Sequence, residues 1–381
     1  MNTIIKLFNR WIVGVLLFHV AAAQSPYYPG ANNEWQRMSP AGAGMNAALM
    51  DSAVQFAIAN ESKWSKDPRE QLAKLFATEP YPGLIGPTKE RGSMNGIILR
   101  GGYIVAEWGD TRRVDMSFSV AKSFVATTAG LAYDRGLIKD FSDPVNKYVS
   151  DGGFDSPHNS NITWQMLLQQ TSEWEGTLFG KPDVADRRKG YDRTLNEPGT
   201  FWEYNDVRVN RASLSVLRVW KRALPSVLKE LVMDPIGASD TWVWHGYDNA
   251  DVEVEGKTVK SVSGGGHWGA GMWISTRDMA RFGLLHLRRG KWNDRQLLSE
   301  QWIDRATTPC SLNMRYGFMW WLNTEKQQWP AAPEQSFAAL GAGDNVIYVD
   351  PVNDLVMIVR WIDRPKFNEF LAKVLAAVER K

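Results

Sequence analysis

The serine and lysine of the segment Ser119-Val120-Ala121-Lys122 have the types and the spacing of a nucleophile and its proton acceptor. The stretch around them, VAKSFVATTAGLAYDRG, is rich in apolar and small residues and predicts a buried helix that opens at Ser119 and ends at Gly136. Residues three apart share one face of a helix, so the Lys122 amine can approach the Ser119 hydroxyl and share or take its proton. The positive end of the helix dipole also favours an alkoxide and any anion formed beside it. Because a free lysine has a pKa of about 10.4, this chemistry requires burial or a neighbouring group that relays the proton.

A second motif supplies such a neighbour. The segment PGTFWEYNDV (198–207) places Tyr204 among aromatic residues after a Pro-Gly turn, and its phenol can relay a proton between Ser119 and a leaving group. Each motif also has a structural interpretation: Ser119 as a helix cap beside a solvated Lys122, and Tyr204 as a core tyrosine with a satisfied hydroxyl. The two motifs together favour the catalytic interpretation.

Other chemistries lack their motifs in this sequence. The histidines after residue 23 are His158, His245, His267 and His286, none of them in an HExxH pattern, and Cys310 is the only cysteine. The tripeptide at 256–258 resembles the end of a phosphate-binding loop, but Asp251 stands where its first glycine belongs, and no GxSxG motif occurs. We therefore expect no metal and no cofactor.

The order of the motifs resembles the serine β-lactamase-like hydrolases, the group of class C β-lactamases, penicillin-binding proteins and family VIII carboxylesterases. The resemblance extends from about Gly96 to Trp361. Two connecting segments, ITWQMLLQQTSEWEG (162–176) and SGGGHWGAGMWISTRDMARFG (263–283), look particularly like the branch of 6-aminohexanoate-oligomer hydrolases and esterases.

This resemblance implies a role for each matching residue. Ser119 is implied as the acylated nucleophile, Lys122 as its proton partner and Tyr204 as the general base and acid. Asp206 falls where the group usually has a substrate-contacting asparagine. The carboxylate either favours a cationic or amide-bearing substrate or pairs with Arg208, and the sequence leaves both open.

The third motif of the group, KTG or HxG, corresponds to FAALGAGDN (337–345), where Ala339 and Leu340 precede Gly341 and no lysine or histidine is present. An oxyanion hole needs an N–H from this strand beside the N–H of Ser119, and Ala342 is the predicted donor. Gly341 is expected to border the substrate. The missing basic residue argues against β-lactamase and transpeptidase activity.

The chain holds 18 Trp, which is more aromatic area than a small core needs. Trp174, Trp202, Trp268 and Trp273 are mostly expected in the core, with Trp174 and Trp268 as the predicted pocket walls. His267 either contacts substrate or caps a turn.

The elements that must position these residues predict an α+β protein. The resemblance implies a β-lactamase/transpeptidase-like fold, an antiparallel sheet flanked by helices plus an all-helical region. A hairpin is expected at 96–108 around Gly101 and Gly102, with β-rich stretches at 316–322, 345–349 and 355–361. Helices are expected near 47–58, 276–288 and 368–381. Residues 24–140 and 260–381 are expected to share the sheet domain, and 141–259 to form the mainly helical region.

The N-terminal stretch indicates export. Lys6 and Arg10 precede an apolar run at 11–20 and then Ala21 to Ala23, the layout of a signal peptide spanning 1–23. An uncleaved N-terminal anchor is the alternative. The single Cys310 permits no intrachain disulfide and no lipid-modified cysteine at the cleavage site, so we expect a periplasmic or secreted protein without stable membrane insertion. With 44 Lys and Arg against 42 Asp and Glu, and no run of like charge that would track a phosphate backbone, nucleic acid is not an expected partner.

The sequence thus predicts an exported serine hydrolase that cleaves a small-molecule ester or amide through an acyl-enzyme. Two alternatives remain open at this level. One is a β-lactamase or D-amino-acid peptidase with the same apparatus, and the other is a catalytically silent scaffold that binds a ligand in the old cleft.

Overall fold

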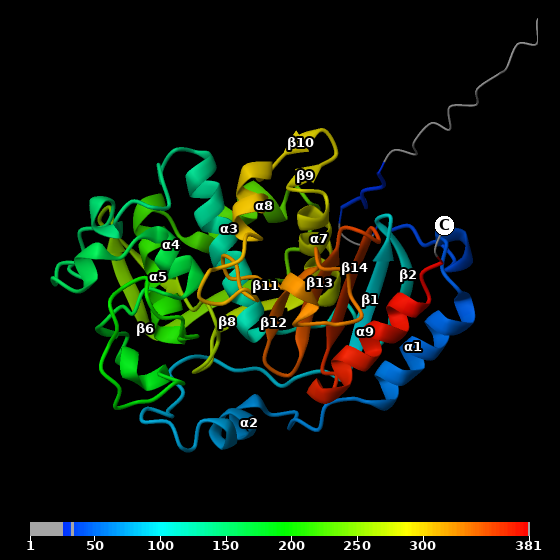
Figure 1. Cartoon of the computed structure of the whole chain (residues 1–381), viewed down its shortest axis with the longest axis horizontal. Coiled ribbons are helices and arrows are strands. Elements are labelled where there is room, and N and C mark those ends of the chain that lie inside the picture. Colours follow the sequence, from blue (N-terminus) through cyan, green and yellow to red (C-terminus); the bar gives the residue numbers. More distant parts are fainter. Residues whose placement is uncertain (1–25, 32–33, 380–381) are drawn as a thin grey trace, which may run out of the picture.

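The computed structural model describes residues 26–31 and 34–379, so the predicted signal peptide lies outside the described residues. Its largest sheet is antiparallel, with six strands in the order β11-β12-β13-β14-β1-β2 (Figure 1). These strands are β1 (Asn95–Arg100), β2 (Tyr103–Trp108), β11 (Trp321–Leu322), β12 (Phe337–Gly341), β13 (Asn345–Asp350) and β14 (Leu355–Arg360). N- and C-terminal segments therefore share one sheet, as predicted.

The predicted hairpin is confirmed. Gly101 and Gly102 connect β1 to β2 with φ values of 61° and 90°, the left-handed backbone that a tight two-residue turn demands and that glycine adopts without strain. The stretch at 316–322 is strand only at its end, because Met319 has a φ of 58° and interrupts the extended backbone.

Successive side chains of each strand point to opposite faces of this sheet, and both faces are buried. On one face, Ile98 and Met357 pack against α1 (Ala47–Ala59) and α9 (Phe367–Ala376), which lie side by side in Figure 1. On the other face, Ile97 and Ile358 join the main core with α7 (Thr276–Leu287). The three predicted helices are thus present and form the layers of the sheet domain. The helix predicted at 368–381 ends earlier, at Ala376, because Val378 pairs with Met45 as an isolated bridge, and 380–381 lie outside the described residues.

The helix α3 (Ala121–Asp134) contacts β12 on one side and α5 (Asp206–Trp220) on the other, so it stands between the sheet and the helical region. Its small residues permit close packing: a Cβ added at Gly130 would lie 2.3 Å from the indole of Trp302. The remaining helices are α2 (Pro68–Leu75), α4 (Trp164–Gln169), α6 (Leu224–Leu228) and α8 (Glu300–Ala306).

The region 141–259, expected to be mainly helical, ends in a strand. This strand, β6 (Val243–Val254), joins a second antiparallel sheet of order β3-β8-β6-β7. Polar and apolar residues alternate along its second half, and Glu255 and Gly256, with φ values of 49° and 73°, form the hairpin turn into β7. The other strands of this sheet are β3 (Val114–Met116), β7 (Lys257–Val262) and β8 (Gly271–Ser275). Two-residue strand pairs complete the description: β4 (Thr177–Leu178) with β5 (Lys181–Pro182), and β9 (Lys291–Trp292) with β10 (Arg295–Gln296).

The helix α2 belongs to a long N-terminal segment that runs along one edge of the molecule before β1 (Figure 1). Its residues from Ser62 to Glu79 contribute to the wall of the cleft described below. Within the described part of the chain, no helix has the length and apolarity that crossing a membrane requires.

One buried histidine of α7 predicts how stability depends on pH. His286 lies in the core beside Trp320, and burial lowers its pKa from 6.5 to about 4. The unfolded chain binds a proton at this residue before the folded chain does, so stability is lost as pH falls from 6.5 toward 4, by about 3 kcal/mol in the limit. Urea unfolding at pH 7 and pH 5 should show this loss in the wild type and a smaller one in His286→Leu. Equal losses in both proteins would contradict the assignment.

Candidate active site

Ser119 lies in a short 3₁₀ turn, η2 (Phe118–Val120), immediately before α3. Phe118 has a φ of 50°, a left-handed backbone that is costly for a residue with a side chain. The N–H and the hydroxyl of Ser117 both donate to the Met272 carbonyl of β8, at 2.9 and 2.7 Å, and hold the turn in place. The turn presents Ser119, which is half-buried, to the cleft while both of its neighbours are buried.

A buried arginine joins the strands beneath this turn. Arg360 of β14 donates to the carbonyls of Met116 and Ile274 at 2.8 and 2.6 Å and to Oδ1 of Asn345 at 2.7 Å. Its three acceptors belong to β3, β8 and β13, so one guanidinium ties both sheets together next to the nucleophile.

Strand β12 approaches the turn so closely that a side chain has no room at Gly341. A Cβ added there would lie 2.1 Å from the Ser117 carbonyl oxygen. Gly341 and Ala342 line the same cleft as Ser119. The predicted oxyanion pair, the N–H groups of Ser119 and Ala342, therefore comes from two segments in close contact, and its role stays a prediction.

Replacing Gly341 by alanine should push β12 away from the nucleophile turn, because the clashing atom belongs to the backbone and cannot rotate away. We expect a loss of roughly 1–3 kcal/mol in unfolding free energy together with a loss of hydrolytic rate. Gly83→Ala is the matched control, since an added Cβ at Gly83 meets nothing within 4 Å. An active Gly341→Ala protein with wild-type stability would contradict this contact.

Lys122 is buried below the cleft and is oriented by two partners. Its Nζ lies 3.0 Å from Oγ of Ser119 and 2.5 Å from Oδ1 of Asp206. Burial lowers the pKa of Lys122, and the Asp206 carboxylate opposes this effect only in part. The predicted Ser119–Lys122 proximity is therefore present, with a lysine that gives up its proton more readily than in water.

Tyr204 lies over the same pair. Its side chain hydrogen-bonds Ser119, and its ring centroid is 4.5 Å from Nζ of Lys122 and 4.8 Å from Cζ of Arg188. Trp321 stacks on the ring at 6.0 Å. Burial and the Asp206 carboxylate raise the pKa of Tyr204, so the phenol keeps its proton at neutral pH.

Asp206 does not pair with Arg208, which corrects one of the two interpretations left open by the sequence. Arg208 donates to Glu173 at 2.6 Å, whereas the Asp206 carboxylate turns to Lys122 and lies 3.4 Å from Nη2 of Arg188. Asp206 is the first residue of α5, so successive helical residues point in different directions. Burial raises the pKa of Asp206, but the surrounding cations lower it by more than burial raises it. The carboxylate is therefore ionised.

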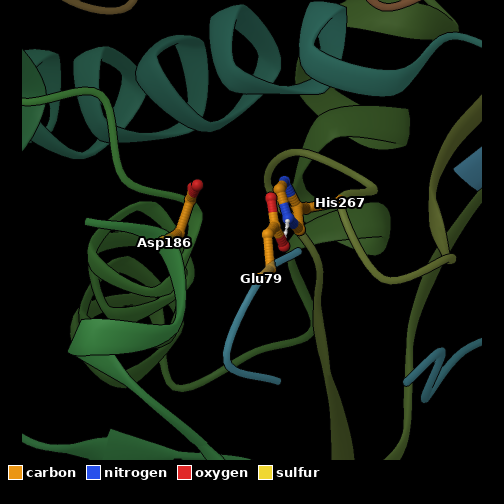
Figure 2. Close-up of side chains that lie close together, drawn as sticks. All are labelled: Glu79, Asp186 and His267. Carbon is orange, nitrogen blue, oxygen red and sulfur yellow. Dashed lines mark hydrogen bonds and ion pairs between the residues drawn. The ribbon is translucent and has the colours of Figure 1, made fainter. Parts of the chain in front are cut away.

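His267 lines the cleft and is bonded on both ring nitrogens. Its Nε2 lies 2.8 Å from Oε2 of Glu79, whose side chain faces the imidazole in Figure 2, and its Nδ1 lies 3.5 Å from Oδ2 of Asp206. Phe76 stacks on the imidazole at 3.9 Å. Burial lowers the pKa of His267, but Asp186, Asp206 and Glu79 raise it to about 9, so the ring is an imidazolium at neutral pH.

Glu79, Asp186 and His267 place their ligand atoms within 4.8 Å of one another (Figure 2). Asp186 already accepts from Nε of Arg188 at 2.7 Å and from the N–H of Asp206 at 2.7 Å. Nη2 of Arg188 also lies 3.3 Å from Nδ1 of His267. Because a guanidinium sits among these groups, the cluster fits a network of ion pairs better than a cation site.

The cleft above Ser119 has a volume of about 930 Å³. The predicted residues that line it are Ser119, Tyr204, Asp206, His267, Gly341 and Ala342. Trp174 and Trp268, predicted as pocket walls, are not among the lining residues. The Trp174 indole is buried and donates to the Gly153 carbonyl at 2.7 Å, and Trp268 is buried behind His267 at 4.4 Å.

The sequence interpretation missed several residues of this cleft. The N-terminal segment supplies Glu79 and an apolar wall, and Trp321 and Arg188 come from two further segments. The only local signal was the basic run of Arg187, Arg188 and Lys189, whereas Glu79 stands in an irregular stretch without a motif. These residues meet Ser119 only through the tertiary fold.

A serine bonded to a buried lysine and a tyrosine, on a turn between an antiparallel sheet and a helical region, defines the SxxK class of serine hydrolases. The chain belongs to the beta-lactamase family, whose model matches residues 93–374. The resemblance inferred from the motifs is thereby confirmed, as are the predicted fold class and the assignment as a serine hydrolase.

Four proteins illustrate how this chain resembles others at low sequence identity. An uncharacterized protein of Alkalihalophilus pseudofirmus is 25% identical over 258 residues, which cover 63% of this chain and 71% of that protein. A Bacillus anthracis protein assigned as a 6-aminohexanoate-dimer hydrolase shares 16% identity with a TM-score of 0.56, over 74% of this chain and 77% of its own. A family VIII carboxylesterase shares 16% sequence identity with a TM-score of 0.55, over 88% of this chain and 98% of its own. A penicillin-binding protein homologue of Caulobacter crescentus shares 14% sequence identity with a TM-score of 0.57, over 83% of this chain and 99% of its own. At these identities the solved structures establish the fold alone.

Proposed function

We propose that the protein hydrolyses an ester or a small amide through an acyl-enzyme formed on Ser119. The observation that carries this proposal is the position of Lys122, whose Nζ lies 3.0 Å from Oγ of Ser119 at the floor of an open cleft. Lys122 accepts the serine proton as Oγ bonds to the substrate carbonyl carbon. The N–H groups of Ser119 and Ala342 bind the resulting oxyanion.

Tyr204 transfers the proton when the tetrahedral intermediate collapses. Its protonated phenol donates to the leaving group as the carbonyl–leaving-group bond breaks, and the Lys122 ammonium returns a proton to Tyr204. Water then attacks the acyl-enzyme with the same groups acting in reverse, which releases the acid and restores the Ser119 hydroxyl. The raised pKa of Tyr204 suits the donor role better than that of a resting base.

The cleft favours a neutral substrate with apolar groups. Several of its charged lining residues have close partners: Nε of Arg364 lies 3.3 Å from Oδ1 of Asp344, and Nε2 of His267 lies 2.8 Å from Oε2 of Glu79. Its walls are largely aromatic and apolar, as contributed by Trp64, Leu72, Phe76, Phe118, Trp321, Trp329, Leu340 and Phe367. In β12, Ala339 stands two residues before Gly341, where the resemblance would place a basic residue, so no cation on this strand meets a β-lactam carboxylate.

The test compares initial rates on p-nitrophenyl esters of increasing acyl length with the rate on a chromogenic cephalosporin. We expect ester turnover, with kcat/KM rising from acetate to hexanoate by up to about fourfold per methylene, the equivalent of about 0.8 kcal/mol each. Trp64→Ala should flatten this rise. Turnover of the cephalosporin alone would favour a β-lactamase, and no turnover of any substrate would favour a ligand-binding scaffold.

We further propose that the protein is exported and processed after Ala23. Lys6, Arg10, the apolar run at 11–20 and the small residues Ala21 to Ala23 support this proposal. Mass spectrometry of the protein recovered from the periplasm or the medium should find Gln24 as the first residue. An intact Met1 on the recovered protein would contradict cleavage.

A further inference from the structure

The direct contact between Asp206 and Lys122 raises a chemical difficulty. A carboxylate 2.5 Å from an amine stabilises the ammonium, and an ammonium cannot accept the proton of Ser119. In the group that this chain resembles, a neutral asparagine usually stands at this position, so the difficulty is a property of this sequence. Burial of Lys122 opposes this effect, and a cation beside Asp206 opposes it further.

Two cations lie against Asp206 on the oxygen that Lys122 does not use. Oδ1 contacts Lys122, whereas Oδ2 lies 3.5 Å from Nδ1 of His267 and 3.4 Å from Nη2 of Arg188. The side chain of Arg188 is 46% exposed and that of His267 only 4%. Solvent screens the guanidinium more, so the imidazolium is the stronger counter-charge.

Glu79 holds His267 in this position and in this charge state. Its carboxylate lies 2.8 Å from Nε2, and Phe76 stacks on the ring at 3.9 Å. Both residues belong to the N-terminal segment, so this segment completes a buried row of alternating charge: Lys122, Asp206, His267 and Glu79. The row ends at the cleft, where Glu79 is 13% exposed.

We propose that His267, held by Glu79, is a positioning residue whose positive charge offsets Asp206 and leaves Lys122 able to take the proton of Ser119. This inference rests on the proposed acyl-enzyme function. It also gives the N-terminal segment a part in catalysis besides its part in forming the cleft wall.

The charges that face Lys122 and His267 together set the protonation of both residues. Lys122 is influenced by Asp206, Asp186 and Arg188, and His267 by Glu79, Asp206, Asp186 and Arg188. Asp186 is itself paired with Arg188 at 2.7 Å, so these two charges largely offset each other. The remaining couple, Asp206 with His267, therefore acts together with burial on how strongly Lys122 holds a proton.

The experiment is the pH profile of kcat/KM for ester hydrolysis, whose acidic limb reports deprotonation of Lys122. His267→Gln keeps a hydrogen-bonding side chain but removes the charge. We expect its acidic limb to move upward by roughly one pH unit, a tenfold loss of rate at a fixed acidic pH, with recovery at higher pH. The double variant His267→Gln/Asp206→Asn should bring the limb back to the wild-type position or below, because no carboxylate then needs a counter-charge.

A purely structural role for His267 would lower the rate at all pH values, leave the limb in place and allow no rescue by Asp206→Asn, and that result would overturn the proposal. Glu79→Gln offers a milder change, and its limb should move upward by less than that of His267→Gln. Its matched control is Glu90→Gln, an exposed carboxylate outside the cleft lining.

NMR titration of the His267 imidazole separates this proposal from the proposed function, since it requires no turnover. The ring should titrate near pH 9 in the wild type and at lower pH in Glu79→Gln and in Asp206→Asn. A neutral ring at pH 7 in the wild type would overturn the inference even if esters are hydrolysed. A charged ring in a protein that hydrolyses no ester would instead contradict the acyl-enzyme function and leave His267 as the counter-charge to Asp206.

Discussion

Ser119→Ala is expected to lower kcat/KM for a p-nitrophenyl ester by about 10⁴-fold or more, because no other group can form the acyl-enzyme. Nζ of Lys122 donates a hydrogen bond to the Ser119 hydroxyl at 3.0 Å, and alanine removes this bond but leaves the backbone of the turn unchanged. The thermal midpoint should therefore stay close to that of the wild type. Initial rates and a thermal melt of the same preparations measure both effects.

Ser311→Ala is the matched control, since Ser311 is exposed and lies outside the cleft lining. It should retain wild-type rate and stability. A fully active Ser119→Ala protein would remove the nucleophile assignment. Mass spectrometry after a short incubation with ester should also find an acyl adduct on the wild type and none on the alanine variant.

Tyr204→Phe is expected to lose roughly 10²- to 10⁴-fold in kcat, the range for a general acid or base. Phenylalanine keeps the packing of the ring against Trp321 and Tyr316 and removes only the hydroxyl that bonds Ser119. Binding of substrate should change little, so the loss should fall on kcat rather than on KM. Steady-state kinetics on an ester with a poor leaving group tests this most sharply, because protonation of that group matters most there.

The control is Tyr81→Phe, which removes the hydroxyl of an exposed tyrosine outside the cleft lining. Wild-type kinetics in Tyr204→Phe would contradict the role of Tyr204 as the proton donor. An equal loss on activated and unactivated esters would instead indicate that the hydroxyl orients Ser119 and does not protonate the leaving group.

The local elements of this fold could be predicted because their signals are local. The glycine pair between β1 and β2 demands a tight turn, and the small and apolar residues after Ser119 form a helix that can be buried on all sides. The strand β6 was missed because its first half does not alternate, and the pairing with β8 that stabilises it comes from residues distant in the chain. Stabilisation by pairing with a distant strand cannot be recognised in a short window of sequence.

The sequence by itself determined which residues can react: the SxxK spacing brings Ser119 and Lys122 onto one side of a turn, and the Tyr204 motif resembles the partner they need. The charge state of these groups was decided only by the tertiary structure. Asp206 was open to two interpretations, and it pairs with Lys122 because α5 begins beside α3. Glu79 and His267 are far apart in the chain and meet only across the cleft, at 2.8 Å. Backbone spacing is a local property, whereas a pKa depends on every charge and on the burial that the whole fold imposes.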